Sequence, residues 1–72
     1  MKTTGLCTNG PRGAMLWLRD GSTLVIDTTD DLSEYYDLVV IAEGIRFDAS
    51  LVLHTITPAN EKPESFFKSG DS

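Results

Sequence analysis

The 72-residue sequence is poor in the residue types on which disulfide-rich, metal-binding and membrane proteins depend. It has one cysteine and one histidine, which excludes an intramolecular disulfide framework and a Cys/His zinc cluster. Its longest uninterrupted apolar run, residues 38–42, is far shorter than the ~20 residues of a membrane span. The first ten residues lack the apolar stretch of a signal peptide. We therefore expect a cytoplasmic protein with no membrane association.

Positive charge is also scarce. Eleven acidic residues against six basic ones give a net charge of −5, with a pI near 4.5. Between residues 13 and 57, only Arg19 and Arg46 oppose eight acids. This balance disfavours binding to nucleic-acid phosphates or to an anionic membrane through bulk charge.

Catalytic signatures are missing as well. No phosphate-binding, dinucleotide-binding, zinc-protease or nucleophile-elbow motif occurs. His54 lies in a β-like run, where we expect a partly buried structural residue. Cys7 has only Lys2 and Arg12 as charged neighbours in sequence, too little positive charge to indicate a reactive thiolate. The acids of residues 27–37 lack the ligand spacing of a calcium loop. We expect a non-enzymatic protein without cofactor or metal.

Short extended segments separated by turn residues make up most of the sequence. In residues 14–28, two apolar runs flank Asp20-Gly21, a dipeptide typical of a two-residue hairpin turn. In that register Trp17 faces Leu24, and both sides of the ribbon are substantially apolar. A one-sided hairpin does not need two apolar faces, so we expect this ribbon to curl into a barrel or to meet a partner.

The rest of the chain predicts further strands. These are residues 3–8, the least defined segment, then residues 38–42, residues 45–48 with Ile45 and Phe47 facing inward, and residues 51–57, which end at Pro58. We expect an all-β fold, a small four- to five-stranded antiparallel barrel or meander, with residues 1–57 as one domain. Residues 58–72 are expected to form a flexible polar C-terminal tail, with at most one short helical turn.

This order of elements resembles the Sm-like or SH3-like small β-barrel. The residues that carry the resemblance are Leu16, Leu18, Asp20, Gly21 and Leu24, followed by residues 38–40 and 55–58. Within that group the chain is similar to the acidic bacterial Rho-inhibitor Rof family. It is less similar to Hfq-type RNA chaperones, whose ring pore needs basic groups that are scarce here. The resemblance to Rof implies an acidic inhibitor that docks on a basic nucleic-acid-binding surface.

Two clusters of residues are candidates for contact with a partner. In residues 27–37 acids surround two tyrosines, a mixture that imitates the charge and stacking character of nucleic acid, and Asp30 or Asp31 can cap one helical turn there. Two aromatic residues in the polar tail either fold back onto the barrel or anchor a partner. The candidate partner-binding residues are Asp30, Asp31, Glu34, Tyr35, Tyr36, Asp37, Phe66 and Phe67.

These observations predict a small acidic regulatory or adaptor module that binds another protein and catalyses no reaction. Two alternatives stay open. In the first, the chain is a structural or assembly subunit whose two-faced strands are buried in a homo-oligomer, and the acidic segment keeps the assembly soluble. In the second, it binds RNA through an Sm-like face.

Overall fold

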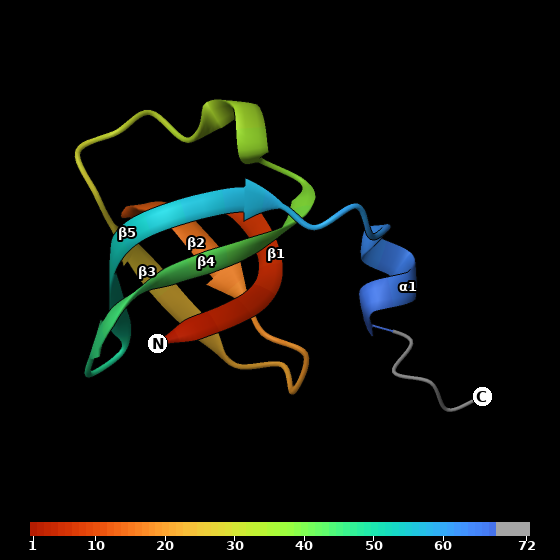
Figure 1. Cartoon of the computed structure of the whole chain (residues 1–72), viewed down its shortest axis with the longest axis horizontal. Helices are drawn as coiled ribbons and strands as arrows, with labels where there is room; N and C mark the ends of the chain where they lie inside the picture. Colours follow the sequence, from red (N-terminus) through yellow and green to blue (C-terminus); the bar gives the residue numbers. More distant parts are fainter. Residues whose placement is uncertain (68–72) are drawn as a thin grey trace.

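The computed structural model describes residues 1–67 and has an all-β architecture (Figure 1). Within this range, five strands close into one barrel: β1 (Lys2–Gly10), β2 (Gly13–Trp17), β3 (Thr23–Asp27), β4 (Leu38–Phe47) and β5 (Ser50–Pro58). A 3-10 turn, η1 (Ser33–Tyr35), precedes β4, and the short helix α1 (Pro63–Phe67) follows β5. The predicted fold class is confirmed: the chain is a small five-stranded β-barrel, consistent with those of SH3-like and Sm-like proteins.

The strand order around the barrel is β1-β2-β3-β5-β4, and β4 closes the barrel against β1. All neighbouring strands are antiparallel except β3 and β5, which run parallel. One pairing thus departs from the predicted antiparallel barrel. The reason is the connection after β3, which crosses one end of the barrel before β4 begins (Figure 1). It lets β4 pair with β1, and β5 then fills the space beside β3, in a Greek-key arrangement that OB-fold barrels share.

The β2–β3 hairpin has a three-residue loop in place of the predicted two-residue turn. The amide of Leu18 donates to the carbonyl of Ser22 (2.8 Å), and the amide of Gly21 donates to the carbonyl of Leu18 (3.0 Å). Asp20 Oδ1 accepts hydrogen bonds from the amide and the hydroxyl of Ser22. Gly21 has a φ of 93°, which glycine adopts without the clash that a Cβ would cause. The Asp-Gly dipeptide therefore forms a longer turn than its usual one.

This loop shifts the hairpin register by one residue. Leu16 pairs with Leu24, and Trp17 pairs with Thr23 instead of with Leu24. Because side chains alternate between the two sides of a strand, a shift of one residue moves one strand's side chains to the opposite face. Leu16 and Leu24 are thus buried in the barrel, whereas Trp17 lies outside it.

β4 is one long strand where the sequence predicted two strands with a turn between them. β4 runs through Gly44 without an extra residue, and the bulge in its pairing lies on β5, where His54 is left between the partners of Glu43 and Gly44. A Cβ on Gly44 would overlap the carbonyl oxygen of Val52, so only glycine lets β5 pass this closely. Beyond the bulge, Ile45 and Phe47 are 71% and 73% exposed, so the prediction that they face inward was wrong. The turn lies at Asp48, whose φ is 60°.

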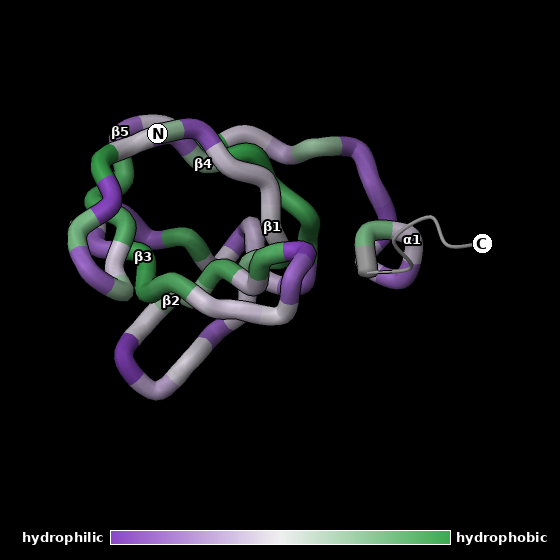
Figure 2. The backbone as a smooth tube through the Cα atoms, turned by 90° about the horizontal axis from the view of Figure 1, so that it is seen from below, coloured by the Kyte–Doolittle hydropathy of each residue, from purple (hydrophilic) through white to green (hydrophobic). Residues whose placement is uncertain are grey.

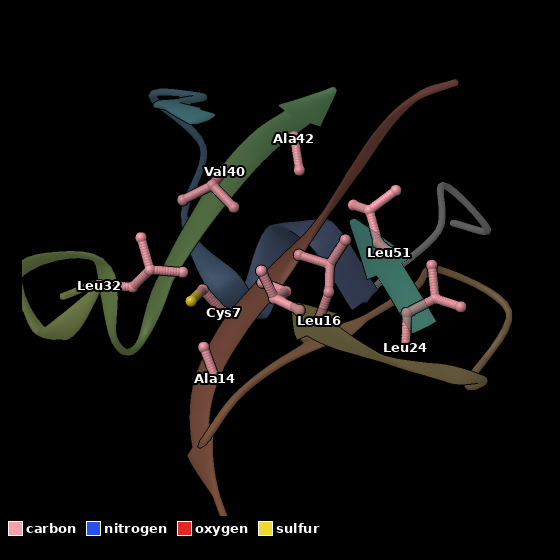
Figure 3. Close-up of a cluster of buried hydrophobic side chains, with 9 residues drawn as sticks. Cys7, Ala14, Leu16, Leu24, Leu32, Val40, Ala42 and Leu51 are labelled. Carbon is pink, nitrogen blue, oxygen red and sulfur yellow. The ribbon is translucent and has the colours of Figure 1, made fainter. Parts of the chain in front are cut away.

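Aliphatic side chains fill the interior of the barrel (Figure 3). The buried cluster consists of Cys7, Ala14, Leu16, Leu24, Ile26, Leu32, Val40, Ala42 and Leu51. It draws on all five strands and on the connection after β3. Each fully buried leucine contributes roughly 1.5–3 kcal/mol through removal of its surface from water. Figure 2 shows the complementary pattern, with apolar residues concentrated in the strands and polar residues in the connections.

α1 packs beside β1 and β4 through Phe66, which is fully buried. The guanidinium carbon of Arg19 lies 4.1 Å from the centre of the Phe66 ring. Arg19 also donates to the carbonyl of Phe66 (2.9 Å) and pairs with Glu61 (3.5 Å). Phe66 was expected either to fold back onto the barrel or to anchor a partner, and in the structure it folds back onto the barrel. The last residues of the expected tail, 68–72, lie outside the described residues.

Candidate functional site

The connection after β3, residues 28–37, crosses one end of the barrel, and we call it the acidic loop (Figure 1). Leu32 is buried in the core cluster, and Tyr35 and Tyr36 pack half-buried against the same cluster. Three side chains therefore attach this loop to the barrel. Sequence analysis did not identify Leu32, although a lone aliphatic residue among acids was a signal that could have found it.

Hydrogen bonds fix the shape of the acidic loop further. Asp31 Oδ1 accepts from the amide of Ser33 (3.0 Å), and Thr28 Oγ1 accepts from the amide of Asp30 (3.2 Å). The hydrogen bonds from Ser33 lower the pKa of Asp31, so its carboxylate is firmly ionised at neutral pH. At the end of the loop, the amide of Asp37 donates to a carbonyl of β1 (2.6 Å).

The carboxylates of the acidic loop face solvent. Asp30, Asp31, Glu34 and Asp37 are all exposed. Within residues 1–67, the ion pair found joins Arg19 to Glu61, and none involves these four acids. Nor do three or more acidic, histidine or cysteine side chains of that range converge on a point that could hold a metal ion. The loop is therefore a spread of negative charge, suited to attracting a positively charged surface.

Two hollows differ in their relation to this loop. One of about 170 Å³ is lined by residues that include Arg12, Asp30, Asp31 and Tyr36. Small-molecule sites usually measure about 300–1,000 Å³, so this hollow is better suited to one side chain of a partner. A larger one, about 420 Å³, lies between β4, the end of β5 and residues 60–62, and contains no predicted site residue.

The structure divides the predicted partner-binding residues into two groups. It brings together on the acidic loop Asp30, Asp31, Glu34, Tyr35, Tyr36 and Asp37. It separates Phe66 from them, because that ring is buried beneath Arg19, and a buried ring cannot anchor a partner. The prediction for Phe66 is therefore corrected, while the side chain of Phe67 lies outside the described residues.

Cys7 and His54 are the other residues whose side chains could take part in chemistry. Cys7 is fully buried, and burial together with the nearby charge of Asp37 raises the pKa of its thiol, so the thiol stays protonated. His54 is exposed on β5, where the sequence predicted a partly buried residue. It is the extra residue of the bulge on β5, between Leu53 opposite Gly44 and Thr55 opposite Glu43, and the alternation of side chains shifts there.

Similarity to known proteins gives no further assignment. Within residues 1–67, no helix is long and apolar enough to cross a membrane. Barrels of this size support many unrelated functions, so the functional argument depends on the surface of this chain. Comparisons with protein-family models, with curated proteins and with solved structures found no match.

Proposed function

We propose that this chain is a non-catalytic regulatory or adaptor module that binds another protein through its acidic loop. The observation that carries the proposal is the combination of four exposed carboxylates with three anchoring side chains in the same loop. A surface whose shape is already fixed loses little conformational entropy on binding. The loop therefore offers its charges to a partner at a lower cost than a mobile acidic tail would.

The chemistry of the loop favours a partner with a basic surface. Tyr35 and Tyr36 are half-buried, so part of each ring and the surrounding carboxylates can be presented together. Surfaces that bind single-stranded nucleic acid combine positive charge with stacking groups, and this mixture complements both. The resemblance to the Rof family supports the same choice, an inhibitor that covers the nucleic-acid-binding surface of its target.

Electrostatic attraction gives this binding mode a characteristic salt dependence. Exposed charges separated by more than about 10 Å are largely screened at 0.1 M salt. We expect rapid association at low ionic strength and slower association as salt rises, with a smaller effect on dissociation.

The test neutralises three loop acids with isosteric amides, in the variant Asp30→Asn, Asp31→Asn and Glu34→Gln. Asn at position 31 still accepts the hydrogen bond from Ser33, so the loop should keep its shape. Pull-downs from cell extract at about 50 and about 500 mM salt should show partner capture that weakens with salt. The variant should retain the captured protein at least about tenfold less well, which corresponds to about 1.4 kcal/mol.

A matched control makes the same change in charge elsewhere, with Glu43→Gln, Asp48→Asn and Glu64→Gln, three acids outside the loop that are also exposed. It should bind like the wild type. Capture that does not change with salt, or equal losses in both variants, would contradict the proposal. Retention of RNA by the wild type in a filter-binding assay would favour direct RNA binding. Loss of the β-sheet circular dichroism signal in the loop variant would show that the acids serve the fold.

A further inference from the structure

A second surface lies on the outside of β2, β3, β5 and the end of β4. Strand pairing places outward residues in one row from Met15 through Val25 and Ser50 to Phe47. A neighbouring row runs from Asp27 through Val52 to Ile45. The apolar members of these rows, together with Trp17 from the adjoining row, form what we call the outer apolar face: Met15, Trp17, Val25, Ile45, Phe47 and Val52.

The exposure of this face is a consequence of the fold. The alternate residues Leu16, Leu24 and Leu51 fill the interior, so their neighbours must face outward. Val52 is 44% exposed and Trp17 39%, and the indole Nε1 of Trp17 donates to Thr8 Oγ1 (3.0 Å). α1, which covers another part of the barrel, lies at the opposite end of the molecule from the β4–β5 turn (Figure 1). Within residues 1–67, no segment covers this face.

We infer that the outer apolar face packs against the same face of a second copy, in a two-fold symmetric dimer. The net charge of −5 makes two copies repel one another over most of their surface, so they can meet only where charge is low. The six members of the face are uncharged, but Asp27 lies in the second of these rows and the exposed Arg46 lies between Ile45 and Phe47 in β4. The face is therefore the surface through which two acidic copies can approach with the least repulsion.

The area of the face just reaches what a weak interface between two copies needs. A whole aromatic side chain offers roughly 150–250 Å², so the four members that are 39–73% exposed, with a smaller share from the half-buried Met15 and Val25, present about 500 Å² per copy. A pair would bury about 1,000 Å², which is the lower bound for a specific interface. We therefore expect a dimer of modest affinity. Pairing of identical sheet faces closes after two copies, so the assembly stops at the dimer.

Single-stranded nucleic acid is the rival occupant. In OB-fold barrels the β2–β3 face and the loops beside it bind oligonucleotides, and Trp17 and Phe47 could offer stacking surfaces there. Such binding also needs cations along the backbone of the nucleic acid. Two arginines lie close to members of this face in the chain: Arg19 is engaged by Phe66 and Glu61, and Arg46 donates to the carbonyl of Asp48. The local charge thus favours a second protein copy.

The test is sedimentation velocity from about 10 µM to about 1 mM, a range that spans modest affinities. The wild type should pass from 7.9 kDa to twice that mass as concentration rises. The variant Ile45→Thr with Phe47→Thr removes the two most exposed residues of the face, places a residue that favours strands at both positions and should dimerise at least about tenfold more weakly. Leu38→Thr, an exposed apolar residue at the other end of β4, should dimerise like the wild type.

Several results would overturn the inference. These are a wild type that stays monomeric throughout, assembly beyond the dimer, or equal effects of the Leu38 and the Ile45/Phe47 changes. If the double variant fails to fold, amide NMR shifts of the wild type on dilution decide, because they must cluster on the outer apolar face. Saturable quenching of Trp17 fluorescence by oligo-dT, with dimer loss, would assign the face to nucleic acid.

The dimer is independent of the proposed function of the acidic loop. The dimer contact uses no residue of the acidic loop, so the variant that neutralises Asp30, Asp31 and Glu34 should dimerise like the wild type. Conversely, the Ile45/Phe47 variant keeps all four loop acids. Failure of one proposal can therefore be recognised without reference to the other.

Discussion

Two single residues, Cys7 and Leu32, matter because their side chains are buried in the core. Cys7 is fully buried in the barrel, so its thiol serves as a small apolar group. Leu32 is the one core residue supplied by the acidic loop, and it links the loop to the packed interior. Two residues that sequence analysis treated as an isolated thiol and as part of a polar loop thus belong to the same core cluster.

The burial of Cys7 predicts a loss of stability at alkaline pH. The native pKa of the thiol is raised, so above the ordinary value of about 8.5 the unfolded chain ionises before the native one. The stability that the protonated thiol gives the native state is fully present below its ordinary pKa, and it is lost as pH rises from there through the raised native pKa. Between about pH 7.5 and 9.5, the free energy of unfolding measured in urea should fall by up to about 1 kcal/mol more for the wild type than for Cys7→Ala.

The range of that experiment ends at about pH 9.5, below the ordinary pKa of tyrosine near 10. The pKa of Tyr35 is also raised, by partial burial and by Glu34, and its contribution to stability has the same sign at higher pH. If wild type and Cys7→Ala lose stability equally over this range, the thiol does not ionise on unfolding as proposed.

At the scale of elements, one residue of loop length and the unbroken course of β4 determine which side chains are outside. The three-residue loop of the β2–β3 hairpin places Trp17 outside and Leu16 inside. β4 continues through Gly44 with its alternation unbroken, so buried Ala42 and Gly44 are followed by an Ile45 that faces outward. Both features use glycine, but for different reasons: Gly21 for its positive φ and Gly44 for the close approach of β5.

These two reasons predict different costs of substitution. Gly44→Ala brings a Cβ against the backbone of Val52 and should destabilise the fold by about 2–4 kcal/mol. Gly21→Ala meets no atom within 4 Å and suffers only the unfavourable φ, which costs about 1–2 kcal/mol. Urea unfolding of the two variants measures the difference. A cost for Gly44→Ala no larger than that for Gly21→Ala would show that β5 shifts easily.

At the scale of the whole molecule, contacts between distant segments complete the structure. β1 pairs with β4 to close the barrel, and the parallel β3–β5 pair joins the two hairpins. The segment after β5 adds a further long-range contact, because Phe66 packs on the barrel and Arg19 packs over its ring. The end of the described chain is therefore part of the folded unit.

This contact predicts that Phe66→Ala destabilises the whole chain. Removing a buried phenylalanine side chain costs about 3–5 kcal/mol in a core, and undocking of the short α1 should reduce this to about 2–4 kcal/mol. Phe66→Leu keeps an apolar side chain but no ring for Arg19, and should cost about 1 kcal/mol. The measurement is urea unfolding of both variants. A stability unchanged by Phe66→Ala would mean that α1 does not dock in solution.

The sequence by itself determined the all-β class, the approximate positions of the strands and the acidic segment. These follow from local patterns, namely β-branched runs, turn residues and the clustering of charge. It also placed six of the candidate site residues on one loop, because they are neighbours in the chain. The binding functions proposed for the two surfaces stay predictions.

Only the tertiary structure decided the register of the β2–β3 hairpin, the continuity of β4, the parallel β3–β5 pair and the burial of Phe66. Each depends on contacts between residues distant in sequence or on a difference of one residue in a turn. Both sides of the β2–β3 ribbon are apolar, so hydrophobic pattern could not choose between the two registers. Closure of the barrel made that choice, and with it placed the outer apolar face in solvent.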